Sequence, residues 1–478
     1  MLFNSLDFAF FLPIVFVLYW FVTNKNLAIQ NALVVVASYV FYGWWDWKFL
    51  GLIILSTLID YTVGTLLDGT DKKGTRKTLL AISIVANLGF LGFFKYYNFF
   101  VDSFIEAFSL FGVELSAGTL NIILPVGISF YTFQTMSYSI DVYRGNLKAT
   151  RDLTAFAAFV SFFPQLVAGP IERATHLLPQ FTRKRSFDAV KAVDGLKQIL
   201  WGLFKKMVVA DTCAHQANLA FNSIDDYSGS GLLVGAIYFA FQIYGDFSGY
   251  SDIAIGTARL FGFDLKQNFA FPYFSRDIAE FWRRWHISLS TWFRDYLYIP
   301  LGGSREGTYK KIRNTFIIFL VSGFWHGANW TFIVWGALHA LYFLPLLLTN
   351  RNRRNMTIVA EGRVFPTFSN FIKIAITFLL VVLAWVFFRA ENVGVAFHYI
   401  GEMFSSSLLS IPENGYADKL ILVVILLTFE WFGRKNQYAI ATLGAKWPRL
   451  LRWLFYYLLI VSIFLFAGEE QEFIYFQF

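Results

Sequence analysis

The residues from Phe371 to Phe388 form the run FIKIAITFLLVVLAWVFF, in which Lys373 is the one charged residue. Because an α-helix of about 20 residues crosses the hydrocarbon core of a bilayer, this run predicts a membrane-spanning helix. Similar apolar runs recur along the chain, for example from Leu50 to Leu67 and from Leu79 to Phe94. We expect roughly eleven spanning helices in total.

The composition agrees with this interpretation. Hydrophobic residues make up 56% of the 478 positions and charged residues 15%, and the mean hydropathy is +0.52. A water-soluble fold could not bury so much apolar surface. We therefore predict an all-α polytopic membrane protein that forms one domain over residues 1–478, with N-terminal helices in 1–120, a core in 121–345 and C-terminal helices in 346–478. The first run, Phe8 to Val22, lacks a basic segment ahead of it and a cleavage site behind it, which predicts a retained helix and not a signal peptide.

Basic clusters between the apolar runs predict how the chain is threaded, because short cytoplasmic loops collect Lys and Arg. The clusters assigned to the cytoplasm are Lys25, Asp71–Lys77, Arg144–Arg151, Arg351–Arg354, Arg434-Lys435 and Lys446–Arg452. With a fifth span near Asn121–Ile140 and acidic residues at Glu469–Glu472, both termini are expected outside. The aromatic string Tyr42–Trp47 is expected to anchor at the outer surface. The net charge of +8 then reflects topology and not nucleic-acid binding.

Several kinds of chemistry lack their usual residues. Cys213 is the single cysteine, so no intrachain disulfide forms, and no Cys/His cluster has the spacing of a zinc site. The sequence has no Walker glycine loop, no G-x-S-x-G elbow and no H-E-x-x-H helix. ATP-driven transport, serine hydrolysis and zinc proteolysis are therefore disfavoured, and we expect no resident metal or cofactor.

The region from Asp141 to Gly323 breaks the regular pattern of spans. Irregular backbone at membrane depth needs protein or a water-filled cavity around it, so we expect re-entrant segments or amphipathic helices around a central cavity. His326 lies in the apolar segment VSGFWHGANW (321–330). An ionisable group there is a functional candidate, and burial keeps an imidazole neutral and able to accept a proton. The alternative is a core histidine with a structural role.

The neighbours of His326 favour a site. Gly323 and Gly327 permit close approach of another backbone or a substrate, and Asn329 offers an amide nearby. His339 follows 13 positions later, about 20 Å along one continuous helix. The two histidines cannot share a site unless the helix breaks, so we expect His339 to be structural. The histidines left unassigned are His176, His215 and His398.

His286 lies in the segment EFWRRWHISLSTWFRD (280–295), whose alternating aromatic and charged residues are typical of an interfacial amphipathic helix. An ordinary surface helix is the alternative. Glu280 is expected to pair with Arg284 at i,i+4. Three further charged residues would then be spare, namely Arg283, Arg294 and Asp295.

The two segments Arg284–Gly303 and Phe324–Trp330 resemble the paired histidine motifs of the membrane-bound O-acyltransferase family, and within it the branch of bacterial alginate O-acetylation proteins. Their order and spacing also match. Further segments that resemble this branch are Pro125–Gln134, Phe163–Pro170, Tyr244–Asp252 and Ala384–Ala390. The likeness covers nearly the whole chain.

This resemblance implies that His326 is the family's essential histidine and His286 its second one. Both would line a tunnel that crosses the membrane between a cytoplasmic donor and an external acceptor. His326 would act as general base on the acceptor hydroxyl as it attacks a thioester, while His286 or Asn329 orients it or stabilises the oxyanion. The expected substrate-binding residues are Asn329, Trp325, Arg284 and Asp295.

The resemblance also implies an acyl thioester as co-substrate, which for this branch is acetyl-coenzyme A. An extracytoplasmic partner of the SGNH-hydrolase type would complete transfer to a polysaccharide, with this chain in the bacterial inner membrane. Three alternatives remain open. They are D-alanyl transfer from a carrier protein to teichoic acid, a transporter or flippase for a lipid-linked sugar with histidines as proton relays, and a catalytically silent scaffold.

Overall fold

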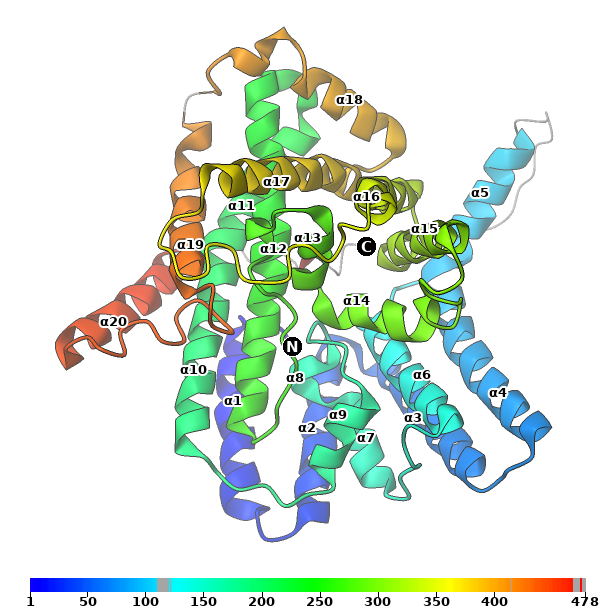
Figure 1. The fold of residues 1–478 in the computed structure, drawn as a ribbon. Coiled ribbons are helices and arrows are strands. Elements are labelled where there is room, and N and C mark those ends of the chain that lie inside the picture. Colours follow the sequence, from blue (N-terminus) through cyan, green and yellow to red (C-terminus); the bar gives the residue numbers. More distant parts are fainter. Residues whose placement is uncertain (110–119, 121, 414, 467–472, 475–478) are drawn as a thin grey trace. The chain divides into compact units, whose positions relative to one another are not determined.

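The computed structural model describes residues 1–109, 120, 122–413, 415–466 and 473–474. Every regular element in these ranges is a helix (Figure 1), which confirms the all-α prediction. Backbone contacts divide the chain into two compact units, Met1–Ala192 with Ala258–Leu265, and Val193–Thr257 with Lys266–Phe478. The expected divisions at residues 120 and 345 stay a prediction. Asn121 and the acidic residues Glu469, Glu470 and Glu472 lie outside the described residues.

The helices of the first unit follow the apolar runs. The run from Leu50 forms α3 (Leu50–Asp68), and the run from Leu79 lies in α4 (Lys73–Leu91) and the π-helical η3 (Gly92–Tyr96). The fifth expected span begins later than predicted, as α6 (Ile128–Arg144). The other elements are α1 (Leu6–Val17), η1 (Leu18–Val22), α2 (Leu27–Asp46), η2 (Trp47–Phe49), α5 (Tyr97–Ser109), α7 (Leu153–Ser161), α8 (Phe163–Leu166) and α9 (Ala174–Phe181).

A buried carboxyl group joins three of these helices. Asp60 of α3 accepts hydrogen bonds from Ser83 of α4 at 2.5 Å, from Asn87 of α4 at 2.7 Å and from Ser139 of α6 at 2.6 Å. A buried polar group is costly unless it is bonded. The three donors therefore fix how α3, α4 and α6 pack.

The second unit contains most of α12 (Gly229–Leu260), a 32-residue helix. Such a long helix was not expected in the irregular region. Shorter elements follow it, which matches the predicted loss of regular spans. The remaining elements after α9 are α10 (Ala189–Leu203), η4 (Phe204–Ala210), α11 (Asp211–Asn222), η5 (Ile224–Asp226), η6 (Pro272–Phe274), α13 (Ile278–Arg284), α14 (Ile287–Phe293), η7 (Arg294–Tyr298), α15 (Thr308–His326), α16 (Trp330–Leu348), α17 (Phe368–Arg389), α18 (Val393–Met403), η8 (Ser406–Leu409), η9 (Tyr416–Lys419), α19 (Leu420–Gly433) and α20 (Arg449–Phe466).

Two buried lysines of the π-helical segment η4 hold α12 in place. The Lys205 ammonium lies 2.6 Å from the Asp252 carboxylate, and the Lys206 ammonium lies 2.9 Å from the carboxylates of Asp246 and Asp211. Asp246 and Asp252 belong to the segment Tyr244–Asp252 that resembled the family. These charges are thus neutralised inside the unit.

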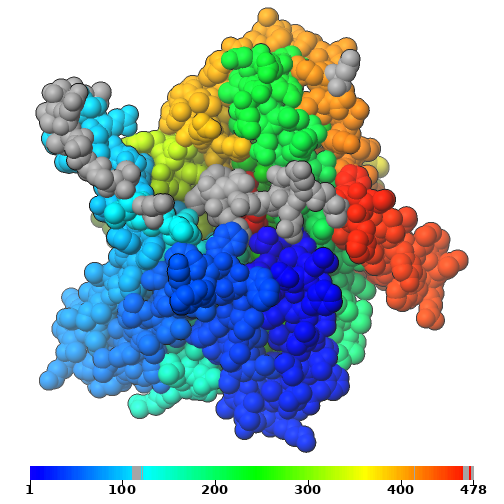
Figure 2. Space-filling model, turned by 180° about the vertical axis from the view of Figure 1, so that it is seen from behind, coloured from blue at the N-terminus to red at the C-terminus, as the bar shows by residue number. Residues whose placement is uncertain are grey.

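Five helical stretches of the described residues are long and apolar enough to cross a membrane. They are Leu27–Asp68, Lys73–Ser109, Trp330–Leu348, Phe368–Arg389 and Arg449–Phe466, and Leu6–Val22 is a shorter apolar helix. The last stretch, α20, leaves most of its apolar side chains exposed and extends as a red arm in Figure 2. Such a surface suits lipid. The count of eleven spans and the side on which each loop lies stay predictions.

The buried ion pairs predict a test of stability. Lys206→Met leaves the carboxylate of Asp246, which is 2% exposed, without its cation. Breaking a buried pair costs about 3–5 kcal/mol, so the unfolding midpoint of the purified protein in detergent should fall markedly. Lys191→Met removes an exposed lysine from α10 and should leave the midpoint unchanged. Equal midpoints for the two variants would contradict the assigned pairing.

Candidate active site

The chain reverses direction immediately after His326. Helix α15 ends at this residue and α16 begins at Trp330. The Asn329 side chain caps α16 by accepting from the Thr331 amide at 3.0 Å, and its own amide donates to the Glu391 carbonyl at 2.7 Å. The helix therefore breaks between His326 and His339, which is the condition under which the two histidines could lie close together.

Glycines allow the two arms of this hairpin to touch. A Cβ atom on Gly323 would overlap the carbonyl of Phe332, and one on Gly336 would overlap the carbonyl of Phe319. A Cβ atom on Gly327 would meet the Phe332 ring. The predicted close approach of another backbone at Gly323 is confirmed, and it fixes α15 against α16 just before His326.

Aromatic rings enclose His326, which is 3% exposed. Its ring centroid lies 5.0 Å from that of Trp325, 5.1 Å from Trp335 and 5.3 Å from Phe388. Trp335 also contacts His339 at 4.8 Å. The hairpin thus brings both histidines against one indole.

His339 is held by packing and one hydrogen bond. The Trp282 indole N–H donates to its Nδ1 at 3.3 Å, and the Phe281 ring stacks on it at 6.2 Å. These contacts agree with a structural role for His339.

His286 lies at a corner between two short helices. It caps the N-terminus of α14 with a φ of 42°, a left-handed conformation that is uncommon for residues with a side chain. The single amphipathic helix expected over residues 280–295 is thus broken here. The ring lies 4.7 Å from Phe247, edge-on, and 6.1 Å from Trp325. Trp325 therefore contacts both candidate histidines.

Burial also sets the charge of His286. The residue is 1% exposed, and desolvation lowers its pKa to about 3. Burial penalises the imidazolium because that form loses its hydration. The ring is thus neutral at any pH near 7.

The arginines around His286 have structural partners. The Glu280 carboxylate binds Arg284 at 2.8 Å, as predicted, and also Arg276 at 2.9 Å. Arg283 donates to the carbonyls of Asn352 and Asn355, both at 2.8 Å. The expectation that Arg283 is spare is wrong, because these bonds tie α13 to the loop after α16.

The remaining pair, Arg294 and Asp295, directly follows α14 at the start of η7. The Arg294 side chain contacts the Asp295 carboxylate at 2.7 Å and is 59% exposed. Arg294 and Asp295 therefore pair with each other, and the expectation that they lack partners is wrong. The Arg294 side chain nevertheless remains largely exposed to solvent.

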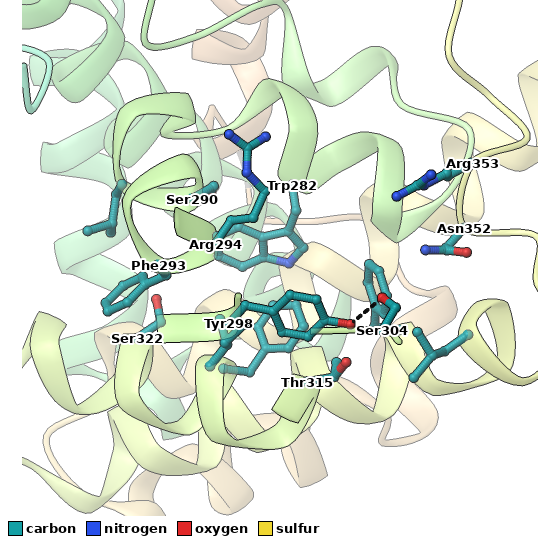
Figure 3. A pocket seen from close by; sticks show the side chains of 15 residues that line it. Trp282, Ser290, Phe293, Arg294, Tyr298, Ser304, Thr315, Ser322, Asn352 and Arg353 are labelled. Carbon is teal, nitrogen blue, oxygen red and sulfur yellow. Dashed lines mark hydrogen bonds between the residues drawn. The ribbon is translucent and has the colours of Figure 1, made fainter. Parts of the chain in front are cut away.

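A pocket of about 230 Å³ opens between α14, α15 and α16 (Figure 3). Its lining residues are Trp282, Leu289, Ser290, Phe293, Arg294, Tyr298, Ser304, Thr315, Ile318, Phe319, Ser322, Phe343, Leu347, Asn352 and Arg353. In Figure 3, Ser290 and Ser322 lie toward one end, and Asn352 and Arg353 toward the other. Ser290 is four residues after His286 and Ser322 four before His326. One end of the pocket is thus a helical turn from each histidine.

Some residues of this site carried no signal in the sequence alone. Trp335 was not singled out because a tryptophan in an apolar run resembles any core residue. Asn268, which contacts His286 at 3.1 Å, lies in an irregular segment that no periodic pattern describes. Phe388 lay inside the segment Ala384–Ala390 that resembled the family, and that segment could have indicated it.

The sequence model of the membrane-bound O-acyltransferase family matches residues 147–388. This range includes both histidines, the hairpin and the pocket lining. The chain belongs to the membrane-bound O-acyltransferase family, and it is an O-acyltransferase.

Three relatives match this chain over all or most of its length. The probable alginate O-acetylase AlgI of Pseudomonas putida is 41% identical, with all of both chains covered. The AlgI of Pseudomonas aeruginosa is 42% identical over 92% of this chain and 82% of its own. The peptidoglycan O-acetyltransferase of Helicobacter pylori is 34% identical over 100% of this chain and 98% of its own. The resemblance found in the sequence is thereby confirmed.

The hairpin geometry predicts that Gly323→Ala is harmful. The added methyl group meets a backbone carbonyl that cannot turn away, and overpacking of this kind costs about 1–3 kcal/mol. The unfolding midpoint in detergent should fall and acyltransferase activity should fall with it, because α15 positions His326. Gly401→Ala, whose methyl group meets nothing within 4 Å, is the matched control. A native midpoint for Gly323→Ala would contradict the contact.

Proposed function

We propose that this enzyme O-acetylates an extracytoplasmic polysaccharide, using an acetyl thioester supplied from the cytoplasm. The observation that carries the proposal is the arrangement of two buried histidines around Trp325, each one helical turn from the same pocket. Its relatives include alginate and peptidoglycan O-acetylating proteins. Both names give a carbohydrate polymer, alginate or peptidoglycan, as the acceptor, which favours a polysaccharide acceptor here.

His326 is the proposed general base. It takes the proton of the acceptor hydroxyl as that oxygen attacks the thioester carbonyl carbon. The tetrahedral intermediate then collapses, the carbon–sulfur bond breaks, and the leaving sulfur takes the proton from His326, which gives the acetyl ester, a free thiol and a neutral histidine. The aromatic shell keeps water away from the reacting groups. His286 is proposed to orient the hydroxyl or stabilise the oxyanion.

The other predicted substrate-binding residues act on this site in two ways. Trp325 is proposed to contact the reactants directly, since it touches both histidine rings. Asn329 and Arg284 are proposed to shape the binding surface through the bonds that their side chains make to the Glu391 carbonyl and to the Glu280 carboxylate. Asp295 is proposed to orient Arg294, its partner at 2.7 Å.

The pocket suits a long thioester with a phosphorylated end, as in acetyl-coenzyme A. Its walls are mainly apolar and aromatic, which suits a pantetheine arm, while Arg294 and Arg353 are exposed guanidinium groups at its border. Guanidinium groups bind phosphate through charge-assisted hydrogen bonds. We therefore assign the donor to this pocket, with its phosphates near Arg353 and its acetyl group near the histidines. The placement of the phosphates near Arg353 fits the cytoplasmic location expected for residues 351–354.

The acceptor side is proposed to face outward. An extracytoplasmic partner of the SGNH-hydrolase type would then receive the acetyl group or deliver the polysaccharide. This agrees with a bacterial inner-membrane protein whose termini both lie outside. The apolar helices of the chain supply the membrane anchor that such a relay needs.

The decisive measurement is release of free coenzyme A from acetyl-coenzyme A by the purified protein in lipid, with an external acceptor present. His326→Ala should lower kcat by about 10²–10⁴-fold, the usual contribution of general base catalysis. His398→Ala removes a histidine that is 49% exposed and paired with Asp225, and it should retain native activity. Full activity of His326→Ala would refute its role as base. No release by any form, together with turnover of a carrier-protein thioester, would favour D-alanyl transfer.

The donor pocket can be tested separately with acetyl-pantetheine, which lacks the phosphates. Arg353→Gln should raise KM for acetyl-coenzyme A about tenfold, the loss of roughly one charge-assisted hydrogen bond, and leave KM for acetyl-pantetheine unchanged. Arg363→Gln replaces an exposed arginine that does not line the pocket and serves as control. An equal rise in KM for acetyl-coenzyme A and for acetyl-pantetheine would show that Arg353 does not bind the phosphates.

A further inference from the structure

Asn268 is fully buried beside His286, and both ends of its amide are bonded. Its Oδ1 lies 3.1 Å from His286 Nδ1, 3.2 Å from the backbone nitrogen of Ser288 and 2.9 Å from the Ser288 hydroxyl. Its Nδ2 donates to the hydroxyl oxygen of Ser251 in α12 at 3.2 Å. Asn268 itself is 0% exposed, so all four contacts lie inside the protein.

The backbone amide of Ser288 decides which way the Asn268 amide points. A backbone N–H can only donate, so the atom that receives it must be the carbonyl oxygen of Asn268. The same oxygen faces Nδ1 of His286. A carbonyl oxygen cannot donate a hydrogen. The Ser288 hydroxyl also lies 3.5 Å from Nδ1, but it donates its hydrogen to Oδ1 at 2.9 Å. We therefore assign the hydrogen between Asn268 and His286 to Nδ1.

This assignment fixes the tautomer of His286. The buried ring is neutral, and a neutral imidazole holds one proton, on one nitrogen only. With that proton on Nδ1, Nε2 carries a lone pair. His286 then offers the reaction a hydrogen-bond acceptor and not a donor.

Backbone and ring contacts hold the imidazole in this position. The Ile287 amide donates to the Asn268 carbonyl at 2.9 Å, which ties the corner at His286 to the segment of Asn268. Phe247 meets the ring edge-on, and Phe269 stacks on it at 6.4 Å and 26°. A rotation of the ring about its side-chain bonds would break the contact between Nδ1 and the Asn268 Oδ1.

We propose that Asn268 is a positioning residue that locks His286 as the Nδ1–H tautomer, so that Nε2 accepts a hydrogen bond from the acceptor hydroxyl. The role given to the hydroxyl rests on the proposed acyl transfer. His286 was proposed either to orient the acceptor hydroxyl or to stabilise the oxyanion. The Nδ1–H tautomer favours orientation of the hydroxyl, because an unprotonated Nε2 has no hydrogen to donate to an oxyanion. His326 remains the group that removes the proton.

The tautomer can be measured without turnover. Protein labelled with ¹⁵N in its histidine rings is compared with the His286→Gln variant by NMR, and the difference isolates the two ring nitrogens of His286. Native protein should show a protonated Nδ1 and an unprotonated Nε2. Asn268→Asp keeps an acceptor oxygen and should give the same pattern, whereas Asn268→Leu should show protonated Nε2. A protonated Nε2 in native protein would overturn the proposal.

Kinetics supply the second readout. Asn268→Leu should lower kcat about 10–100-fold, as is typical when the partner that orients a functional histidine is lost, with KM for the thioester unchanged. Asn268→Asp should restore most of kcat. Asn222→Leu, an exposed asparagine at the end of α11, is the control.

The two hypotheses fail in different ways. If native protein turns over and folded Asn268→Leu keeps the native kcat, the lock is refuted and the acyltransferase proposal stands. If no form consumes a thioester, the proposed function fails, while the native ¹⁵N spectrum still decides the tautomer. Should Asn268→Leu not fold, the native spectrum and the Asn268→Asp variant decide the matter.

Discussion

The constraint behind this structure is that a polar group removed from water must find its partner within the chain. Unpaired buried charges and amides each cost several kcal/mol. In the second unit the paired charges Lys205–Asp252 and Lys206–Asp246 hold η4 against α12. The same stretch of α12 presents Phe247 to the His286 ring and Ser251 to Asn268. The ion pairs therefore set the position of the residues that hold a candidate functional histidine.

The same constraint divides the arginines near the site into those bonded inside the protein and those exposed at the pocket. Arg283 and Arg284 donate hydrogen bonds to carbonyl oxygens and to Glu280. A guanidinium engaged in this way has few N–H groups available to bind a substrate anion. Arg294 and Arg353 border the pocket and remain exposed. Exposure, and not the number of arginines in a motif, thus indicates where phosphate would bind.

The sequence predicted those features that depend on composition and local pattern. Apolar runs became helices such as α3 and α17, and the i,i+4 pair of Glu280 with Arg284 formed as expected. The sequence leaves open whether the helix breaks after His326, because Gly327 and Asn329 do not themselves show which segment packs against them. Their meaning depends on α16 packing back on Gly323. Asn268 was missed for a related reason, since its role comes from three contacts that no local pattern encodes.

The surroundings of the two histidines also explain why they would divide the work. His326 is the last residue of the 19-residue helix α15, and a helix C-terminus carries a partial negative charge that stabilises a cation. If His326 is the base, as proposed, the imidazolium that it forms would gain from that field. His286 lies instead at the N-terminus of α14, where the partial charge is positive and a second proton is opposed. This polarity, together with the Asn268 contact, favours His326 as the proton carrier and His286 as a fixed neutral acceptor.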